Sequence, residues 1–295
     1  MTLYQERSSN IWRTAFLMAG FLAVVLAIGY AVAWYYDTPI LLYVAIVFAV
    51  GMNFYSYWFS DRQVLSMTNA REAKRDEFFD FYTVAENMAI TAGIPIPKLY
   101  VIEDSAPNAF ATGRDEKHAV VCATTGLLAM MTRPELEGVI AHEMSHIKNR
   151  DILLMTVAVV LAGFVAIIAD IFLRMSMWGG RRDREGGGLL MVLAIVGIIL
   201  APLAATLIEL AISRRREYLA DASGALLTRY PEGLASALAK IGSYPAAMER
   251  PSHATAHLFI GDPFGPGKTD FIDKLFSTHP PIPERIKALM GGGGK

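Results

Sequence analysis

The sequence predicts an α+β protein in which four membrane-spanning helices accompany a mainly helical domain with a small sheet. Three observations predict this class: four long apolar runs, helix and strand patterns in the polar segments between them, and positive charges beside the runs. Hydrophobic residues make up 54% of the 295, and mean hydropathy is positive, which is too apolar for an ordinary soluble domain. The formal net charge of −1 gives no global electrostatic attraction for nucleic acid.

Each apolar run is long enough to cross a bilayer, which needs about 20 predominantly apolar residues. The first run is too long for a signal-peptide core and lacks a small-residue cleavage site, so we expect it to be an anchor. The third and fourth runs contain Asp170, Pro202 and Glu209, and are therefore less lipid-like than the first two. The four runs are 14–36, 38–59, 152–173 and 189–212.

Lys and Arg residues near the runs predict which side each segment faces, because cytoplasmic loops are enriched in positive charge. Positive residues flank the runs as Arg7 and Arg13, then Arg62, Arg71, Lys74 and Arg75, then Lys148 and Arg150, and finally Arg214, Arg215 and Arg216. We therefore expect four units: a membrane hairpin over 1–60, the first half of a cytoplasmic domain over 61–151, a second hairpin over 152–212, and the second half of the domain over 213–295.

One loop disagrees with this topology. Arg174, Arg181, Arg182 and Arg184 lie between the third and fourth runs, which the topology places outside. Either the loop crosses because the other positive charges outweigh it, or these two runs form a hairpin that does not fully cross. The length of the runs favours full crossing.

The segment after the second run predicts a helix followed by strands. Helical periodicity covers 76–92 and stops at Gly93, with two prolines just beyond. Leu99–Ile102, Asn108–Thr112 and Ala119–Ala123 have strand character, and a polar turn around 114–117 joins the last two.

The most informative motif is H-E-x-x-H at His142–His146, on a helix that Thr132 and Glu135 begin as a capping box with Pro134 in its first turn. Residues four apart share a helix face, so both histidines can bind one metal ion. Zn²⁺ suits imidazole, and Glu143, offset around the helix, is placed to act as a general base. The alternative is a surface helix with two solvated histidines. Cys122 is the only cysteine, which excludes a cysteine zinc site and an intramolecular disulfide.

Two histidines do not complete a zinc site, and the best third ligand is Glu217. It lies one turn beyond the fourth run, as His146 lies one turn before the third, so a hairpin of the two runs brings them together. Asp221, four residues on, can accept the second N–H of a ligating histidine. The alternative is a charged cluster that pairs with Arg214 and Arg216.

Together these motifs resemble the M48 family of membrane zinc metallopeptidases, over nearly the whole chain. The resemblance implies a zincin-like metalloprotease domain, one Zn²⁺ per chain and hydrolysis of peptide bonds. It also implies that His279 stabilises the oxyanion of the tetrahedral intermediate, where a turn histidine is the alternative. The matching stretches are Pro107–Gly113, Ala141–Asp151, Arg216–Asp221, Thr255–Ile260 and Thr278–Pro281.

The resemblance further places the strand over Asn108–Gly113 at an exposed sheet edge, where Asn108, Ala109, Phe110 and Ala111 bind substrate as an added strand. An ordinary structural hairpin is the alternative. The implied substrates are polypeptides, above all misfolded or damaged membrane proteins in envelope quality control. The implied location is the bacterial inner membrane, with the active site facing the cytoplasm and other membrane quality-control proteases as partners. Two other functions stay open: an M48 peptidase with a dedicated processing substrate, and a non-catalytic zinc-binding membrane adaptor.

Overall fold

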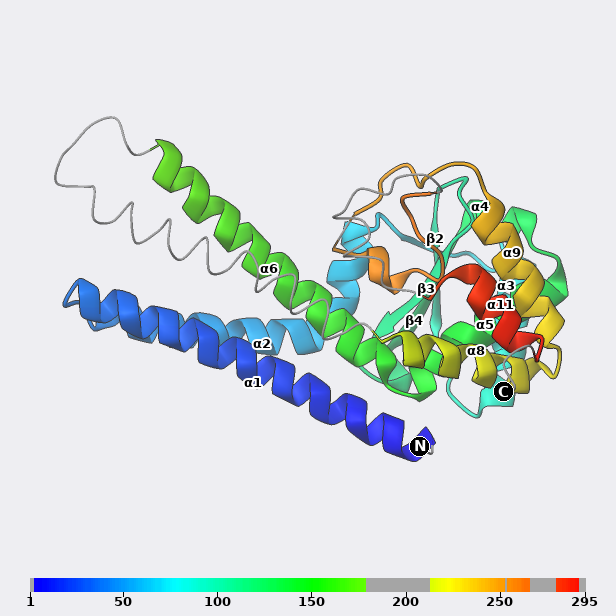
Figure 1. The fold of residues 1–295 in the computed structure, drawn as a ribbon, viewed down its shortest axis with the longest axis horizontal. Helices are drawn as coiled ribbons and strands as arrows, with labels where there is room; N and C mark the ends of the chain where they lie inside the picture. Colours follow the sequence, from blue (N-terminus) through cyan, green and yellow to red (C-terminus); the bar gives the residue numbers. More distant parts are fainter. Residues whose placement is uncertain (1–2, 179–212, 253, 266–279, 292–295) are drawn as a thin grey trace.

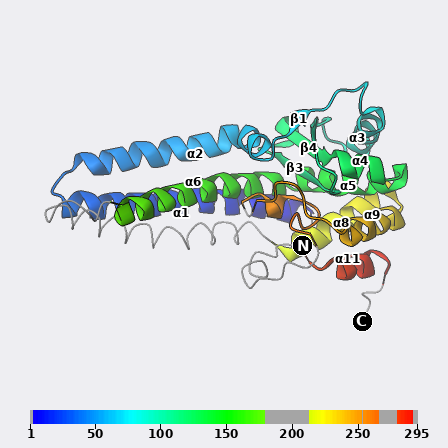
Figure 2. The same ribbon diagram turned by 90° about the horizontal axis from the view of Figure 1, so that it is seen from above.

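The computed structural model describes residues 3–178, 213–252, 254–265 and 280–291. Three long helices extend from one side of a compact part that contains a small sheet, so the molecule is elongated (Figures 1 and 2). The fourth predicted run, 189–212, lies outside the described residues, as do the arginines at 181, 182 and 184. The prediction of four membrane helices is therefore matched for three of them.

The three long helices are α1 (Leu3–Tyr35), α2 (Ile40–Met67) and α6 (Asp151–Trp178). Within the described residues, these are the helices long and apolar enough to cross a membrane. They pack on one another through Leu17 and Phe21 of α1 and a row of buried residues on α6 that includes Leu154 and Leu161. The most apolar windows of α1 and α2 are only 17% and 11% buried, so their outer faces present apolar side chains to the surroundings.

The sheet has four strands in the order β1-β2-β4-β3. The strands β2 (Lys98–Ile102) and β4 (Ala119–Thr124) are parallel, whereas β3 (Ala109–Gly113) and β1 (Arg71–Glu72) pair antiparallel to their neighbours. The three strands that the sequence predicts are all present. The strand β1 was not predicted, because two residues are too few to show an alternating pattern.

Both faces of the sheet are covered, as every residue of β4 is buried. Val121 and Ala123 face the helices α3 (Phe79–Ala92), α5 (Arg133–Lys148) and α9 (Pro231–Ser243). Val120 and Cys122 face the opposite cluster, which contains the end of α2, the beginning of α6 and a short 3₁₀ helix over Ala256–Leu258. This alternation follows from the period of two along a strand.

The helix α6 therefore belongs to both parts of the molecule. Its apolar window is 72% buried, and Met155 and Val159 near its beginning pack against Phe110 of the sheet. The first half of the third apolar run is thus core rather than lipid-facing surface.

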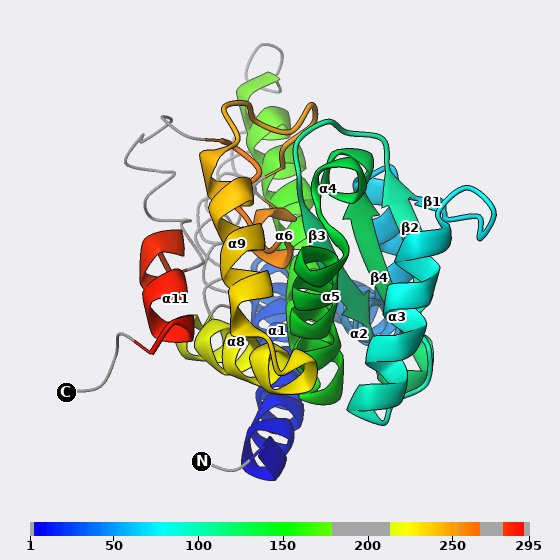
Figure 3. The ribbon, with the colours of Figure 1, turned by 90° about the vertical axis from the view of Figure 1, so that its right-hand side faces the viewer.

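The remaining helices are α4 (Thr125–Met130), α8 (Arg214–Thr228) and α11 (Ile282–Leu289). Figure 3 shows α11, α9, α5 and α3 as a row, and each neighbouring pair is in contact. The helix α8 crosses this row and contacts α5, α9 and α11. This crossing brings a segment from beyond the apolar runs against the helix that carries H-E-x-x-H.

Candidate metal centre

The helix α5 holds both histidines of the motif in the interior of the protein. It begins as the sequence predicts, with the Thr132–Glu135 capping box and a proline in the first turn. His142 is 1% exposed and His146 is 5% exposed, which excludes a surface helix with solvated histidines. Their Nε2 atoms lie 3.1 Å apart.

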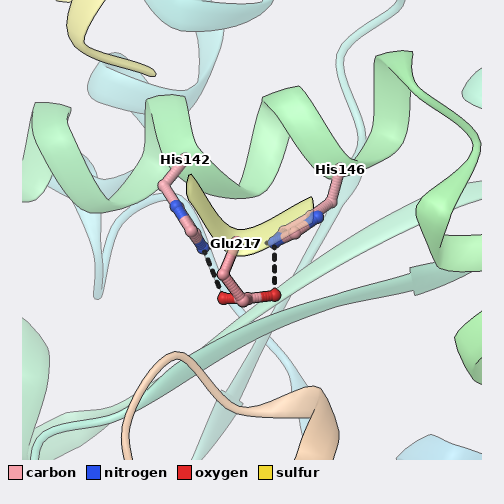
Figure 4. A group of neighbouring side chains, drawn as sticks. All are labelled: His142, His146 and Glu217. Carbon is pink, nitrogen blue, oxygen red and sulfur yellow. Dashed lines mark hydrogen bonds and ion pairs between the residues drawn. The ribbon is translucent and has the colours of Figure 1, made fainter. Parts of the chain in front are cut away.

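Glu217 completes a group of three donors. Its Oε2 lies 3.7 Å from Nε2 of His142, and its Oε1 lies 3.6 Å from Nε2 of His146 (Figure 4). Zn–N bonds of 2.0–2.1 Å at tetrahedral angles place two ligand atoms about 3.3 Å apart, so all three separations suit one ion. The three side chains offer ligand atoms within 4.8 Å of one another, and all three are buried. The residues present therefore fit a zinc site.

Glu217 reaches this position because α8 crosses α5 at very short range. It lies in the first turn of α8, and Gly224 of the same helix lies against the backbone of Ala141 and His142 on α5. A Cβ on Gly224 would lie 3.0 Å from the backbone nitrogen of His142, so only glycine fits without a shift of one helix.

Each histidine has a carboxylate at its other ring nitrogen. Asp221, which the sequence analysis placed beside a ligating histidine, has its Oδ1 2.9 Å from Nδ1 of His142. Asp151 Oδ2 lies 2.9 Å from Nδ1 of His146. These contacts select the tautomer that leaves both Nε2 atoms available to a metal. Burial alone lowers the pKa of His146, but the hydrogen bond with Asp151 and the charge of Glu217 raise it to about 9, so a metal ion that binds Nε2 has to displace its proton.

Sequence reasoning missed the role of Asp151. The residue is the first of α6 and follows Arg150, whose φ of 61° is in the left-handed region. That residue redirects the chain, so the side chain of Asp151 returns toward His146 rather than continuing along the face of α5. An acidic residue just after the motif could have suggested a partner for His146. Acidic residues are common in the first turn of any helix, so this signal is weak.

Asp221 is itself held by Arg285 of α11. The guanidinium donates two hydrogen bonds to the carboxylate, from Nε to Oδ2 at 2.8 Å and from Nη2 to Oδ1 at 2.7 Å. A third goes from Nη1 to the carbonyl oxygen of Ile260 at 3.0 Å. Arg285 is fully buried, and with His142 it holds the pKa of Asp221 well below its usual range despite the opposing effect of burial. The sequence-based alternative, pairing of this cluster with Arg214 and Arg216, thus misses the cation that binds Asp221.

Glu143 lies between the two histidines on α5 and is outside the group of three donors. It is 2% exposed, and its burial raises the pKa of the carboxyl above the ordinary value. The charges of both histidines oppose this rise, and the charge of Glu217 adds to it. A carboxylate with a raised pKa is a better proton acceptor, as a general base requires.

The strand β3 is an edge strand of the sheet, but its beginning is not exposed as the sequence analysis expected. All five of its residues are buried, and the carbonyl oxygen of Ala109 accepts a hydrogen bond from the nitrogen of Ile260. The side-chain amide of Asn108 bonds both the nitrogen and the oxygen of Gly261, each at 3.0 Å. The ring of Phe110 packs edge-on against a phenylalanine of the same segment. The covering segment is far along the chain, which is why the sequence did not reveal it.

Two predicted site residues remain, Ala111 and His279. Ala111 lies within β3 and packs in the core shared with α5. His279 lies outside the described residues, so its role stays a prediction.

Comparison with known proteins decides the family. A model described as peptidase family M48 matches residues 77–291. This chain belongs to peptidase family M48. The prediction of M48 membership is confirmed, and the chain is a protease by family.

Several relatives carry the description "Protease HtpX homolog". The one from Thermoanaerobacter pseudethanolicus is 49% identical over 298 residues, covering 98% of this chain and 97% of the relative. The one from Pyrococcus furiosus is 48% identical over 285 residues, with 95% of each covered. The one from Streptococcus gordonii is 44% identical over 296 residues, with 97% and 99% covered. With three long apolar helices, the M48 family membership indicates a membrane protein.

A solved structure of Ste24p from S. mikatae is similar, with a TM-score of 0.47 and 20% sequence identity. It covers 98% of this chain, and this chain spans 66% of its length.

Proposed function

We propose that this chain is a zinc-dependent endopeptidase that cleaves misfolded or damaged membrane proteins at the cytoplasmic face of a bacterial inner membrane. The single observation that carries the proposal is the buried group of His142, His146 and Glu217 with Glu143 beside it. Membership of the M48 family supports the same chemistry. A structural zinc site needs no neighbouring base, which counts against a non-catalytic adaptor.

When bound, zinc supplies a Lewis acid that polarises the scissile carbonyl and acidifies water. Glu143 accepts the proton of the attacking water and delivers it to the leaving amine. Asp221 and Asp151 hold His142 and His146 in the tautomer that binding requires. His279 is expected to stabilise the negative charge that develops on the carbonyl oxygen.

The position of the metal centre supports a membrane-associated substrate. His146 lies near the end of α5, and the candidate span in α6 begins at Asp151. A polypeptide that leaves the bilayer next to α6 is therefore presented close to the site. The Lys and Arg residues that flank the apolar runs support a cytoplasmic location.

The chemistry is tested by Glu143→Gln in the purified full chain in detergent, with casein as an unfolded substrate. We expect the variant to retain stoichiometric zinc and to lose activity by about 10²-fold or more, because the general base is removed. Glu137→Gln is the matched control, since Glu137 is on the same helix and pairs with Arg133 near the surface. Equal cleavage by Glu143→Gln and the wild type would show that this carboxylate is not the base.

The substrate class is tested by capture of substrates on the inactive Glu143→Gln variant in cells. The quality-control proposal expects many membrane proteins, enriched when protein damage increases. Recovery of one dominant partner would replace this proposal with a dedicated processing role.

A further inference from the structure

A polar residue of the first long helix contacts the surroundings of the metal centre. Asn10 lies on α1 and is fully buried. Its Nδ2 donates one hydrogen bond to Oδ1 of Asp151 at 2.6 Å and another to the carbonyl oxygen of Asn149 at 3.1 Å. These partners belong to the junction between α5 and α6, so Asn10 bridges segments that are far apart in the chain.

Asp151 connects this contact to a metal ligand. One carboxylate oxygen accepts from Asn10, and the other lies 2.9 Å from Nδ1 of His146. With both oxygens engaged, the carboxylate plane is fixed, and so is the direction from which it meets the imidazole. Loss of Asn10 frees one oxygen and allows the carboxylate to turn away from His146.

The junction itself depends on support from outside. The helix α5 ends at its C-cap Asn149, Arg150 has a φ of 61°, and α6 begins at Asp151. A left-handed conformation is unfavourable for a non-glycine residue and persists where neighbouring contacts stabilise it. Asn10 contacts the residues on both sides of Arg150, and Arg150 itself donates to the carbonyl oxygen of Arg114 at 3.3 Å.

A polar residue that served only helix packing would be expected to bond within its own helix. Thr14, one turn further along α1, does this by donating to the carbonyl oxygen of Asn10 at 2.9 Å. Asn10 instead donates to the carboxylate that holds His146.

We propose that Asn10 is a positioning residue of the metal centre: it acts through Asp151 to orient His146 and thereby raises the affinity for zinc. The packing of α1 against the α5–α6 junction then influences the ligand geometry. This proposal rests on the proposed zinc site at His142, His146 and Glu217.

The test is the zinc affinity of the purified full chain in detergent, measured by competition with a chromophoric chelator. We expect Asn10→Ala to weaken zinc binding about tenfold, the lower end of the range for groups that hold a ligating histidine. Asp151→Ala should weaken it at least as much. Thr14→Ala is the matched control, because it removes a buried hydroxyl from the same helix without touching Asp151, and it should change affinity less than twofold.

A double-variant cycle separates a positioning role from a general loss of packing. Since Asn10 acts through Asp151, the Asn10→Ala change should add no more than about twofold once Asp151 is alanine. Additive effects of the two changes would overturn the proposal. Asn10→Leu keeps the branched shape of the side chain and suits an apolar helix, so it provides a second variant if Asn10→Ala is unstable. Zinc affinity equal to wild type in Asn10→Leu would also overturn the proposal.

A further variant distinguishes failure of the proposed zinc site from failure of the proposed role of Asn10. Glu217→Ala in the same assay tests whether zinc binds at the three-donor group at all. If the wild type and Glu217→Ala bind zinc equally, the proposed site is wrong. If only the wild type binds and the Asn10 variants match it, the site stands and the positioning role is wrong.

Discussion

Replacement of Arg285 by leucine is expected to destabilise the protein and loosen the metal centre. The guanidinium is fully buried and donates two hydrogen bonds to Asp221 and one to the carbonyl oxygen of Ile260. Leucine removes all three donors. Of its contacts within the described residues, the carboxylate of Asp221, itself 2% exposed, then keeps the one with His142.

The size of the effect follows from the burial of the pair. Removal of one partner from a buried ion pair costs about 3–5 kcal/mol, because the other charge is left uncompensated. The free energy of unfolding of a domain is typically about 5–15 kcal/mol, so this loss is a large share of it. At roughly 2–4 °C per kcal/mol for a chain of this size, the melting temperature should fall by about 6–20 °C.

The assay is thermal unfolding of the detergent-purified protein, with and without excess zinc. Lys287→Ala is the matched control, because Lys287 is exposed on the same helix, and it should change stability by no more than about 0.5 kcal/mol. Arg285→Lys keeps the charge but loses the planar guanidinium that donates two hydrogen bonds to Asp221. We therefore expect its stability to lie between those of the wild type and Arg285→Leu. The reasoning is refuted if Arg285→Leu melts within about 2 °C of wild type, or if Arg285→Lys restores full stability.

Two further predictions concern carboxylates. Glu217→Ala should abolish stoichiometric zinc binding, since it removes one of three donors; elemental analysis that finds a full equivalent of zinc in this variant would contradict the ligand assignment. Glu135 tests pH dependence: burial favours a higher pKa, but hydrogen bonds from Lys240, Ser236 and Thr132 lower it from 4.5 to about 2. The stability that this ionised carboxylate contributes is complete above about pH 4.5 and is lost as the pH falls toward 2. In Glu135→Gln the melting temperature should therefore depend less on pH in this window. An unchanged pH dependence would show that ionised Glu135 does not contribute this stability.

Local patterns in the sequence predicted the part of the site that one helix supplies. The capping box, the proline and the spacing of His142 and His146 all depend on residues within a few turns of one another. Glu217 is not local, yet its position one turn beyond an apolar run made its return predictable. Membrane helices constrain topology strongly, because the chain has to come back to the side from which it left.

The contacts around the histidines could not be predicted in the same way. Asp151 reaches His146 only because Arg150 is in a left-handed conformation, which a non-glycine residue rarely shows. Arg285 and Asn10 come from helices distant in the chain, and their positions follow from packing among α1, α6, α8 and α11. Side-chain packing of this kind leaves no periodic signal in the sequence.

Hydropathy also gave an incomplete account of the third apolar run. A lipid-facing helix and a buried core helix are both apolar on all sides, so composition does not separate them. In α6, Val157 and Leu161 pack against membrane-helix neighbours, whereas Met155 and Val159 pack against the sheet. One apolar stretch thus serves two environments.

The distribution of the metal-binding group along the chain has a consequence for biosynthesis. The ribosome releases His142 and His146 well before Glu217, and Arg285, which anchors Asp221, emerges later still. A nascent chain therefore exposes two histidines and a potential base while the third ligand is absent. The three-donor group is complete only after α8 has docked on α5, and Asp221 is held only after α11 has brought Arg285 to it. The order of translation thus delays assembly of the candidate metal centre until nearly the whole chain has left the ribosome.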